Sequence, residues 1–473
     1  MLALSVLIAK LVTAQGSMLA AIVAVIALAS SVPLNGYGQL NQITHHVFML
    51  VPLAAAALYL FPPLVRQPKW NLSGIVAGAL LALALWISPE TMPMVTALLA
   101  VRAAHHVQEV GNGPLFPIAA GLLGMLLLAW WLDPPPPTFS EWALDHVSLA
   151  WLLFALLLAL LLVLVDLLEA RNLQLSTRLL ITAAATMGAG FMWVHVVPHA
   201  LQGPEGLIPA ELKYEWWDHI LELQPVRSAT EWIASLFMPV LSGITLLVVA
   251  YRNKSLWMAV LAVSLFAYAA LAFQHMRMGA AAGMLAATGY GIALARLDAF
   301  RNLRTTSLNN RQQLTVVLLM LMPVMQLMLV WVLKKDEAGM AASSQSSTRC
   351  RISDIAPWLK SLPAGIALTP INDGPELLWH TSHRIVAGNY HHNVSGLLDH
   401  HRIWKSEAPD EHAQQLIGER KIDYVLACGV SKPESIQTSD QRSLVRRMNA
   451  GERIAWLPAP QKIGSWWVYR TKR

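Results

Sequence analysis

Residues 147–168, VSLAWLLFALLLALLLVLVDLL, decide the class of fold. The stretch contains one charged residue, Asp166, and it meets the length of about 20 mostly apolar residues that a helix needs to cross a lipid bilayer. It therefore predicts a transmembrane helix.

Similar stretches recur through the first two thirds of the chain, and the composition also indicates a membrane protein. The chain is 55% hydrophobic and 13% charged with a mean hydropathy of +0.48, whereas soluble proteins have about 25% charged residues. By the length criterion, the sequence predicts a mainly α, polytopic helical bundle of about eleven spans. Residues 1–14 look like the end of a further helix. The spans other than 147–168 are 17–32, 44–61, 72–87, 92–104, 115–132, 179–197, 231–250, 255–273, 280–294 and 314–333.

Lysine and arginine residues in the short loops predict the orientation of the bundle. Alternate loops are rich in them, which indicates the cytoplasmic side of a bacterial inner membrane. The loop 198–230 is then periplasmic and, because the number of spans is odd, so is the C-terminal part. The net charge of +6 comes from these clusters and does not indicate nucleic-acid binding. The basic loops contain Arg66, Lys69, Arg102, Arg171, Arg178, Arg252, Lys254, Arg296, Arg301, Arg304 and Arg311, and the opposite loops contain Lys213, Arg227 and Arg277.

A change of periodicity predicts a transmembrane domain (1–335), a Ser/Ala-rich linker (336–350) and a small C-terminal α/β periplasmic domain (351–473). Short β-branched and aromatic runs predict strands, and longer polar-apolar patterns between them predict helices. The strands are expected at 365–369, 384–387, 422–427 and 465–470, and the helices at 411–420 and 441–450.

The two cysteines, Cys350 and Cys428, both lie in the polar C-terminal part. If that part is extracytoplasmic, it lies in a compartment that permits disulfide bonds. A disulfide and two unpaired thiols are both open interpretations of the sequence.

Ionisable side chains at the predicted periplasmic edge are candidates for a functional site, because charges within a membrane are costly. His45 and His46 stand where a loop enters a span, and neighbouring imidazoles can bind a metal or an anionic phosphate. Glu90, in the turn SPETMP, could act as a general base or hold a cation. The alternative for the histidines is an interfacial cap, and for Glu90 it is a helix N-terminal cap.

The long periplasmic loop carries another candidate group. Asp218, His219 and Glu222 have a spacing that predicts one shared helix face, where they could bind a divalent cation or activate an acceptor. Gln224 follows in the sequence ELQP. An ordinary solvated helix face is the alternative, and the spacing alone favours it.

Two further groups complete the candidate set. His275 and Arg277 lie in an otherwise charge-poor periplasmic turn, where an arginine could face a lipid phosphate or simply snorkel to the membrane surface. Residues 373–399 form the densest polar run of the C-terminal part and include Arg384 and His391. We expect this run to be mostly loop, either as a site facing the membrane or as a solvated surface.

Several of these segments resemble a group of bacterial multispanning membrane proteins that look like GT-C type glycosyltransferases. The resemblance implies a helical membrane core, a periplasmic soluble domain, and transfer of a sugar from a polyprenyl-phosphate donor to an acceptor at the outer face of the membrane. The segments are QLNQITHHVFML (39–50), LALWISPETMP (83–93), ELQP (222–225), DGPELLWHTSHRIVAGNYHHNVSGLLD (373–399) and KIDYVLAC (421–428).

The sequence departs from the GT-C pattern in two places. GT-C enzymes carry an essential acidic residue in the first periplasmic loop, and here no acidic residue precedes Glu90. The resemblance therefore implies that an N-terminal span and loop are missing. The sequence WWD (216–218) resembles a motif of oligosaccharyltransferase catalytic subunits, but it precedes four predicted spans rather than following the last one, so its role is not transferred.

The leading hypothesis is a GT-C-like transferase that uses a lipid-linked sugar. The donor phosphate would lie near His45, His46 and Arg277, and Glu90, with Glu222 or Asp218, would hold a cation such as Mg²⁺ or Mn²⁺ or deprotonate the acceptor. The alternative is a non-enzymatic transporter, flippase or assembly subunit for lipid-linked saccharides. The sequence leaves the catalytic activity of the chain open. We assign Gln224, His275, Arg384 and His391 to substrate binding.

Overall fold

The computed structural model of the chain consists of two compact units. The first comprises Met1–Gly206 and Glu222–Glu337, and the second comprises Leu207–Leu221 and Ala338–Arg473. The sequence-based boundaries placed all of 1–335 in one domain, whereas here a piece of the long loop groups with the C-terminal unit. The structure describes residues 1–37, 45–61, 70–108, 113–133, 140–171, 173–203, 206, 208–297, 300, 310–341, 350–390, 392–429 and 442–471.

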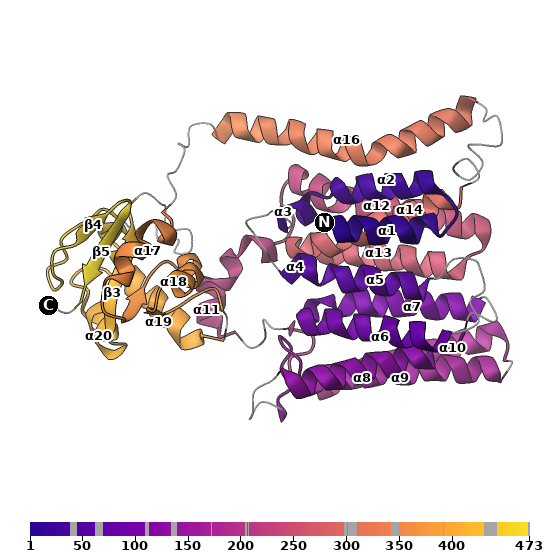
Figure 1. Cartoon of the computed structure of the whole chain (residues 1–473), viewed down its shortest axis with the longest axis horizontal. Coiled ribbons are helices and arrows are strands. Elements are labelled where there is room, and N and C mark those ends of the chain that lie inside the picture. Colours follow the sequence, from indigo (N-terminus) through magenta and orange to yellow (C-terminus); the bar gives the residue numbers. More distant parts are fainter. Residues whose placement is uncertain are drawn as a thin grey trace. The chain divides into compact units, whose positions relative to one another are not determined.

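The first unit is built of helices that run side by side (Figure 1). Most of them are apolar along their whole length, and α4 and α5 together form one apolar stretch, His45–Leu60. They are α1 (Leu2–Thr13), α2 (Met18–Ala29), α3 (Val32–Tyr37), α4 (His45–Phe48), α5 (Leu50–Leu60), α6 (Trp70–Ile87), α7 (Met92–Gln108), α8 (Phe116–Leu132), α9 (Leu149–Ala170), α10 (Leu175–Val196), α12 (Ala229–Asn253), α13 (Leu256–Gln274), α14 (Gly279–Ala295) and α16 (Asn310–Ala341).

Within the described ranges, six helices are long and apolar enough to cross a membrane, and five shorter helices are also apolar. The prediction of a mainly helical, multi-pass membrane unit is therefore confirmed. The predicted number of about eleven spans is not confirmed, because the five shorter apolar stretches contain 10 to 17 residues, at or below the lower limit of about 17 residues for a span. The six long ones are α9, α10, α12, α13, α14 with the turn before it, and α16.

Helix α14 is almost completely buried, and its sequence, GAAAGMLAATGYGIALA, explains how. A Cβ atom on Gly283 would lie 2.2 Å from Oγ of Ser31, and one on Gly291 would lie 2.6 Å from Cβ of Ala24. The neighbouring helices therefore approach α14 at distances that only glycine allows. This packing fixes the turn Met276–Met278, which leads directly into α14 and carries Arg277.

The second unit contains a five-stranded sheet in the order β2-β1-β3-β5-β4. The strands β1 (Ile366–Leu368), β2 (Arg384–Ile385) and β3 (Ile422–Cys428) are parallel, and β5 (Trp466–Arg470) runs antiparallel to both β3 and β4 (Gln461–Ile463). The second unit also contains helices beside the sheet (Figure 1). They are α11 (Ala210–Glu215), α17 (Ile352–Lys360), α18 (Gly374–His380), α19 (Val394–Lys405), α20 (Glu411–Glu419) and α21 (Leu444–Asn449).

The expectation that residues 373–399 are mostly loop is wrong. They contain α18, β2 and the first half of α19. Local signals explain both helices: Pro375 occupies the first turn of α18, where its missing N–H has no cost, and the Asn393 side chain accepts a hydrogen bond from the Gly396 N–H (3.2 Å) at the start of α19. The dense polar residues of this run masked those signals.

Cys350 and Cys428 form a disulfide with a Cα–Cα distance of 6.0 Å. It joins the chain just before α17 to the last residue of β3, and both residues are buried in the core of the second unit. This resolves the two interpretations of the cysteines in favour of the bond. Residues 336–341 of the predicted linker form the end of α16, and residues 342–349 lie outside the described residues.

Candidate functional site

Charged and polar side chains from four separate segments meet at one end of the helical unit. Glu90 comes from the 3₁₀ turn Pro89–Thr91 between α6 and α7, and Arg277 from the turn before α14. His46 is the second residue of the short helix α4, and Glu222 lies in the second half of the long loop. We name Tyr37, His45, His46, Glu90, Glu222 and Arg277 the carboxylate–arginine cluster.

Glu90 stands at the centre of the carboxylate–arginine cluster. Its Oε1 atom lies 2.9 Å from Nη2 of Arg277, and its Oε2 atom lies 3.8 Å from Nδ1 of His46. The local backbone holds it there, because Ser88 is extended, Pro89 begins the turn and the Thr91 hydroxyl donates to the Ser88 carbonyl (2.9 Å). The capping role expected for this turn and a site for the carboxylate are therefore compatible.

His46 is buried between two rings. The ring of Tyr37 lies 4.6 Å away and that of His45 lies 4.0 Å away, centre to centre. Within the described part of the chain, Nδ1 of His46 is buried and accepts or donates no hydrogen bond. A buried polar atom without a partner is costly, which marks this nitrogen as available to a ligand.

Glu222 is held from the other side by Tyr37. The Tyr37 hydroxyl donates to Oε2 of Glu222 (3.0 Å), and Nη2 of Arg277 lies 3.9 Å from Oε1. Burial and the nearby Glu222 carboxylate raise the pKa of Tyr37, so its hydroxyl stays a donor. Arg277 therefore faces two carboxylates and is closer to Glu90.

Backbone hydrogen bonds tie the end of the long loop to the turn that carries Arg277. The Val226 N–H donates to the Phe273 carbonyl (2.8 Å), and the Met276 N–H donates to the Gln224 carbonyl (3.1 Å). The His275 Nδ1 atom lies 2.9 Å from the Leu223 carbonyl, which can only accept, so this nitrogen carries the proton. His275 thus fixes the loop, and the Gln224 side chain accepts from Arg227 (2.5 Å).

The other predicted site residues lie elsewhere. Asp218 is exposed and belongs to the second unit, and so does Arg384, which is exposed on β2. His391 and the side chain of His219 lie outside the described residues.

The expectation that Asp218, His219 and Glu222 share a helix face is wrong. Helix α11 ends at Glu215, and Trp216 has φ −132° and ψ −55°, which breaks the helix before two short 3₁₀ turns. Trp216 and Trp217 are both buried, and adjacent residues of a regular helix point about 100° apart.

Sequence reasoning missed Tyr37, which links Glu222 to His46. A tyrosine near a membrane surface is usually an interfacial anchor, so the residue type gave no signal. Its position immediately before the polar segment 38–44 is the only available clue.

His45, His46 and Glu90 could together hold a metal ion. One potential ligand atom from each residue lies within 4.8 Å of the others. The Nδ1 atom of His46, which makes no hydrogen bond within the described residues, is a potential ligand. Two imidazoles and a carboxylate suit Mn²⁺ or Zn²⁺ better than Mg²⁺, which prefers oxygen ligands.

No family model matches the sequence, and no curated protein matches it either. Solved structures, in contrast, match its fold. The fold resembles an archaeal oligosaccharyltransferase. The structure of oligosaccharyltransferase AglB from Archaeoglobus fulgidus, in complex with an inhibitory peptide and a dolichol-phosphate, has a TM-score of 0.63 and 13% identity, over 90% of this chain and 57% of that one.

Two more oligosaccharyltransferase structures from Archaeoglobus fulgidus are similar. One, tethered to an acceptor peptide containing the NVT sequon, has a TM-score of 0.62 and 14% identity, over 90% of this chain and 56% of that chain. The other, a complex with Zn and sulfate, has a TM-score of 0.60 and 13% identity, over 90% and 55%. The chain therefore spans a little over half the length of the oligosaccharyltransferases it matches, and at this identity the likeness concerns the fold. It supports the predicted architecture of a mainly helical membrane unit with a small C-terminal domain.

Proposed function

We propose that the chain is a GT-C-like membrane glycosyltransferase that moves a sugar from a polyprenyl-phosphate donor to an acceptor at the periplasmic face of the inner membrane. The observation that carries the proposal is the convergence of Glu90, Glu222, His46 and Arg277 from four segments at one end of the helical unit. Fold likeness to a protein solved with a dolichol-phosphate supports the lipid-linked donor.

Arg277 is the group best suited to the donor phosphate. Its guanidinium presents several N–H donors in a plane and stays charged, which matches phosphate oxygens. Its Nε atom is buried and makes no hydrogen bond within the described residues. Nη2 points to Glu90, so a phosphate that approaches Nε would leave the ion pair in place.

The transfer step needs a base and a neutralised leaving group. The acceptor nucleophile would attack the anomeric carbon, the bond between that carbon and the phosphate oxygen would break, and the acceptor proton would pass to a carboxylate. Glu222 is the better placed base, because its side chain is 37% exposed and lies farther from Arg277 than Glu90 does. Arg277 would stabilise the negative charge left on the polyprenyl phosphate.

A divalent cation at His45, His46 and Glu90 would add positive charge beside that phosphate when bound. These residues fit such an ion, as the unpartnered Nδ1 of His46 indicates. An oligosaccharyltransferase of the same fold was solved with Zn.

The periplasmic location rests on two features. The alternating basic loops predict that this end of the bundle is opposite the cytoplasm. The Cys350–Cys428 disulfide suits an oxidising compartment, since such bonds are rare in the cytosol.

The transporter alternative is favoured by a second polar group at the other end of α7. There His106 lies 3.2 Å from Oδ1 of Asp166 on α9. However, Asp166 also accepts hydrogen bonds from the N–H groups of Leu115 (2.8 Å) and Phe116 (2.8 Å), as a cap for α8. This structural role accounts for Asp166, so the second group gives the transporter less support than the carboxylate–arginine cluster gives the transferase.

The test uses the full chain in lipid nanodiscs with radiolabelled sugars on polyprenyl phosphate. Release of polyprenyl phosphate is measured for wild type, Glu90→Gln and the control Glu141→Gln, which removes an exposed carboxylate between α8 and α9. We expect the first variant alone to lose release. Full activity of Glu90→Gln would disprove its role. Movement of the intact labelled lipid across the membrane of proteoliposomes, without release of polyprenyl phosphate, would establish transport instead.

A further inference from the structure

The second unit exposes its large apolar side chains mainly in one place. In the part of this unit that the structure describes, the exposed large hydrophobic residues are Tyr214, Leu378, Trp379 and Tyr390, and the last three belong to α18 or to the turn after β2. Trp379 is the most exposed of them, at 85%, with Tyr390 at 61% and Leu378 at 50%. Neighbouring exposed apolar residues mark sites of interaction with a protein or a membrane.

The spacing along α18 puts Pro375, Leu378 and Trp379 on one side of the helix, because residues three and four apart are neighbours on a helix surface. All three residues are exposed. Gly374 and Leu377, in contrast, are buried and face the core of the unit. Helix α18 therefore buries one side and presents an apolar ridge on the other.

A second segment extends this exposed surface. A Cβ atom on Gly388 would lie 3.9 Å from Cδ of Pro375, so the turn after β2 runs beside the start of α18. The Tyr390 N–H donates to the Gly388 carbonyl (2.7 Å), which keeps Tyr390 close to that point. We name Pro375, Leu378, Trp379 and Tyr390 the aromatic patch.

The aromatic patch carries no charge, and the acidic residue within α18 is engaged elsewhere. Oε1 of Glu376 accepts from the Ser353 N–H (3.1 Å) in the first turn of α17, and it lies 4.0 Å from Nε2 of His380. Tryptophan and tyrosine are enriched where lipid headgroups meet the acyl chains, since their rings are apolar and their polar groups can stay in contact with water. An uncharged surface of these residues suits that region of a bilayer.

The connectivity of the chain keeps the second unit beside a membrane. Peptide bonds join it to the helical unit at 206–207, 221–222 and 337–338, and the helical unit contains the six helices that are long and apolar enough to span a bilayer. Such tethering makes contact with the lipid surface an intramolecular event, so a small affinity for lipid is sufficient. The lipid surface is therefore a partner that is always near the aromatic patch.

We propose that the aromatic patch docks on the surface of the lipid bilayer, with Trp379 as its main anchor. The indole of Trp379 and the side chain of Leu378 enter the boundary between headgroups and acyl chains. Docking limits the orientations that the second unit adopts at the membrane. Of the two interpretations of residues 373–399, it selects the one in which they face the membrane.

Electron paramagnetic resonance of the full chain in phosphatidylcholine nanodiscs tests the docking. The two cysteines of the chain are joined in the disulfide, so a cysteine that replaces Leu378 is the only one that a nitroxide reagent labels. Oxygen is apolar and concentrates among the acyl chains, whereas a nickel chelate stays in water. We expect the label at 378 to collide mainly with oxygen. A label on Gln414→Cys, at an exposed position of α20, should collide mainly with nickel.

Replacement of Trp379 by alanine in the labelled chain should release the aromatic patch. The ratio of docked to undocked unit should fall about tenfold or more, because a large apolar side chain no longer leaves water. Trp379 is mostly exposed, so its removal opens no cavity in the core. Tyr214→Ala is the matched control, since it removes an exposed aromatic ring of α11, outside the patch, and should leave the collisions at 378 unchanged. Added salt should also leave them unchanged, because salt does not screen an apolar contact.

Four results would overturn the proposal. Equal collision with nickel at 378 and 414 would mean that the patch is solvated. A label at 378 that collides with neither reagent would mean that protein covers the patch instead of lipid. Unchanged lipid exposure at 378 in Trp379→Ala would exclude Trp379 as the anchor, and loss of docking in salt would indicate an ionic contact. None of these results depends on sugar transfer, so the proposed function is tested separately.

Discussion

The Nη2 atom of Arg277 lies 2.9 Å from Oε1 of Glu90, although the turns that carry the two residues are far apart in the sequence. Each turn also leads into a helix, so the ion pair links the beginnings of α7 and α14. It places a cation and an anion side by side in a partly buried setting, where removing one partner leaves the other uncompensated.

Replacement of Arg277 by glutamine should remove the proposed phosphate contact and leave Glu90 unpaired. We expect release of polyprenyl phosphate to fall about 100-fold or more, the loss that removal of a charge-stabilising donor produces. Arg277→Lys should recover only part of it, because lysine lacks the planar fork. Arg227→Gln, at an exposed arginine nearby, serves as the control. Equal activity of Arg277→Gln and wild type would rule out the phosphate role.

Replacement of Tyr37 by phenylalanine should remove the hydrogen bond to Glu222 while keeping the ring beside His46. A hydrogen bond to a charged group contributes about 1.5–3 kcal/mol, so we expect a roughly 10- to 100-fold slower transfer step. The donor KM should stay constant. Single-turnover kinetics measures this, and an unchanged rate would show that Glu222 needs no support from Tyr37.

Metal binding by His45, His46 and Glu90 can be measured directly with Mn²⁺. Electron paramagnetic resonance of the full chain should show one tightly bound ion, and the signal should disappear in His46→Ala and Glu90→Gln. His195→Ala, at an exposed histidine of α10, should keep it. Equal Mn²⁺ binding by wild type and the two site variants would place any metal elsewhere.

Close packing of α14 predicts a steric effect on stability. Gly283→Ala places a methyl group 2.2 Å from Oγ of Ser31, and we expect a loss of about 1–3 kcal/mol, as for other overpacked cores. Gly124→Ala on α8 is the matched control, because nothing lies within 4 Å of its Cβ position. Thermal unfolding in detergent compares the two, and equal midpoints would contradict the close approach of α14 to Ser31.

Acid should weaken the second unit through His400 on α19. Burial, with His401 beside it, lowers the pKa of His400 to about 3, against about 6.5 in an unfolded chain. A lowered folded-state pKa means that the stabilising contribution is complete above pH 6.5 and is lost as the pH falls toward 3. From pH 7 to pH 5 we expect a loss of about 2 kcal/mol.

Exchange of the α19 amides, corrected for intrinsic rates, measures the effect of pH on the second unit. The control is His412→Gln on the exposed side of α20, which should keep the pH dependence. Identical corrected protection at pH 7 and pH 5 in the wild-type chain would contradict a buried neutral His400.

The apolar stretches predicted the helical unit, and the strand pattern predicted the C-terminal unit with its sheet. Both predictions succeed because they depend on local periodicity in the sequence. The charges of the loops also placed His46, Glu90 and Arg277 at one membrane edge. Their direct contact could not be predicted, since it depends on how tightly α14 packs in the bundle, and that is set by Gly283 and its distant neighbour Ser31.

The wrong predictions share a cause. The spacing of Asp218 and Glu222 suggests one helix face only if the helix continues, and α11 ends at Glu215. In the same way, the polar run 373–399 suggested a loop, although Pro375 and Asn393 are helix-start residues. In each case the prediction followed the chemistry of the side chains and overlooked the backbone.

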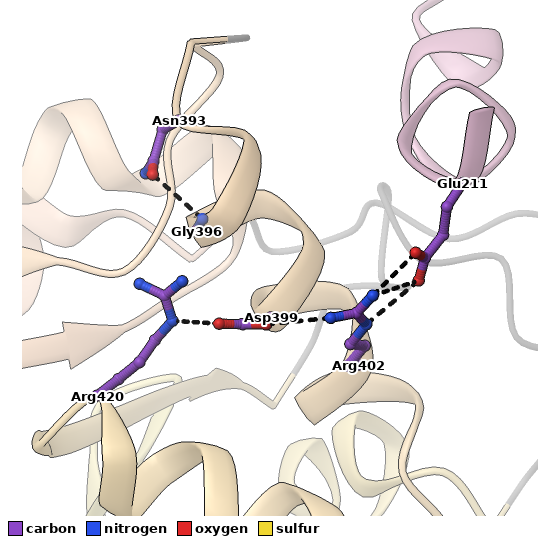
Figure 2. Close-up of polar contacts among 6 residues, drawn as sticks. All are labelled: Glu211, Asn393, Gly396, Asp399, Arg402 and Arg420. Carbon is purple, nitrogen blue, oxygen red and sulfur yellow. Dashed lines mark hydrogen bonds and ion pairs between the residues drawn. The ribbon is translucent and has the colours of Figure 1, made fainter. Parts of the chain in front are cut away.

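The segment Leu207–Leu221 makes the second unit discontinuous in sequence, and this matters for anyone who wishes to study that unit alone. A fragment that begins at Ala338 would omit Glu211 and the buried Leu212, although it would retain Arg402 and the disulfide. It would leave the surface of α19 that contacts α11 uncovered and Arg402 without its partner Glu211 (Figure 2). An isolated version that keeps both parts of the unit requires Leu207–Leu221 to be attached through a new connection, so that the order of segments in the gene differs from the order in the native chain.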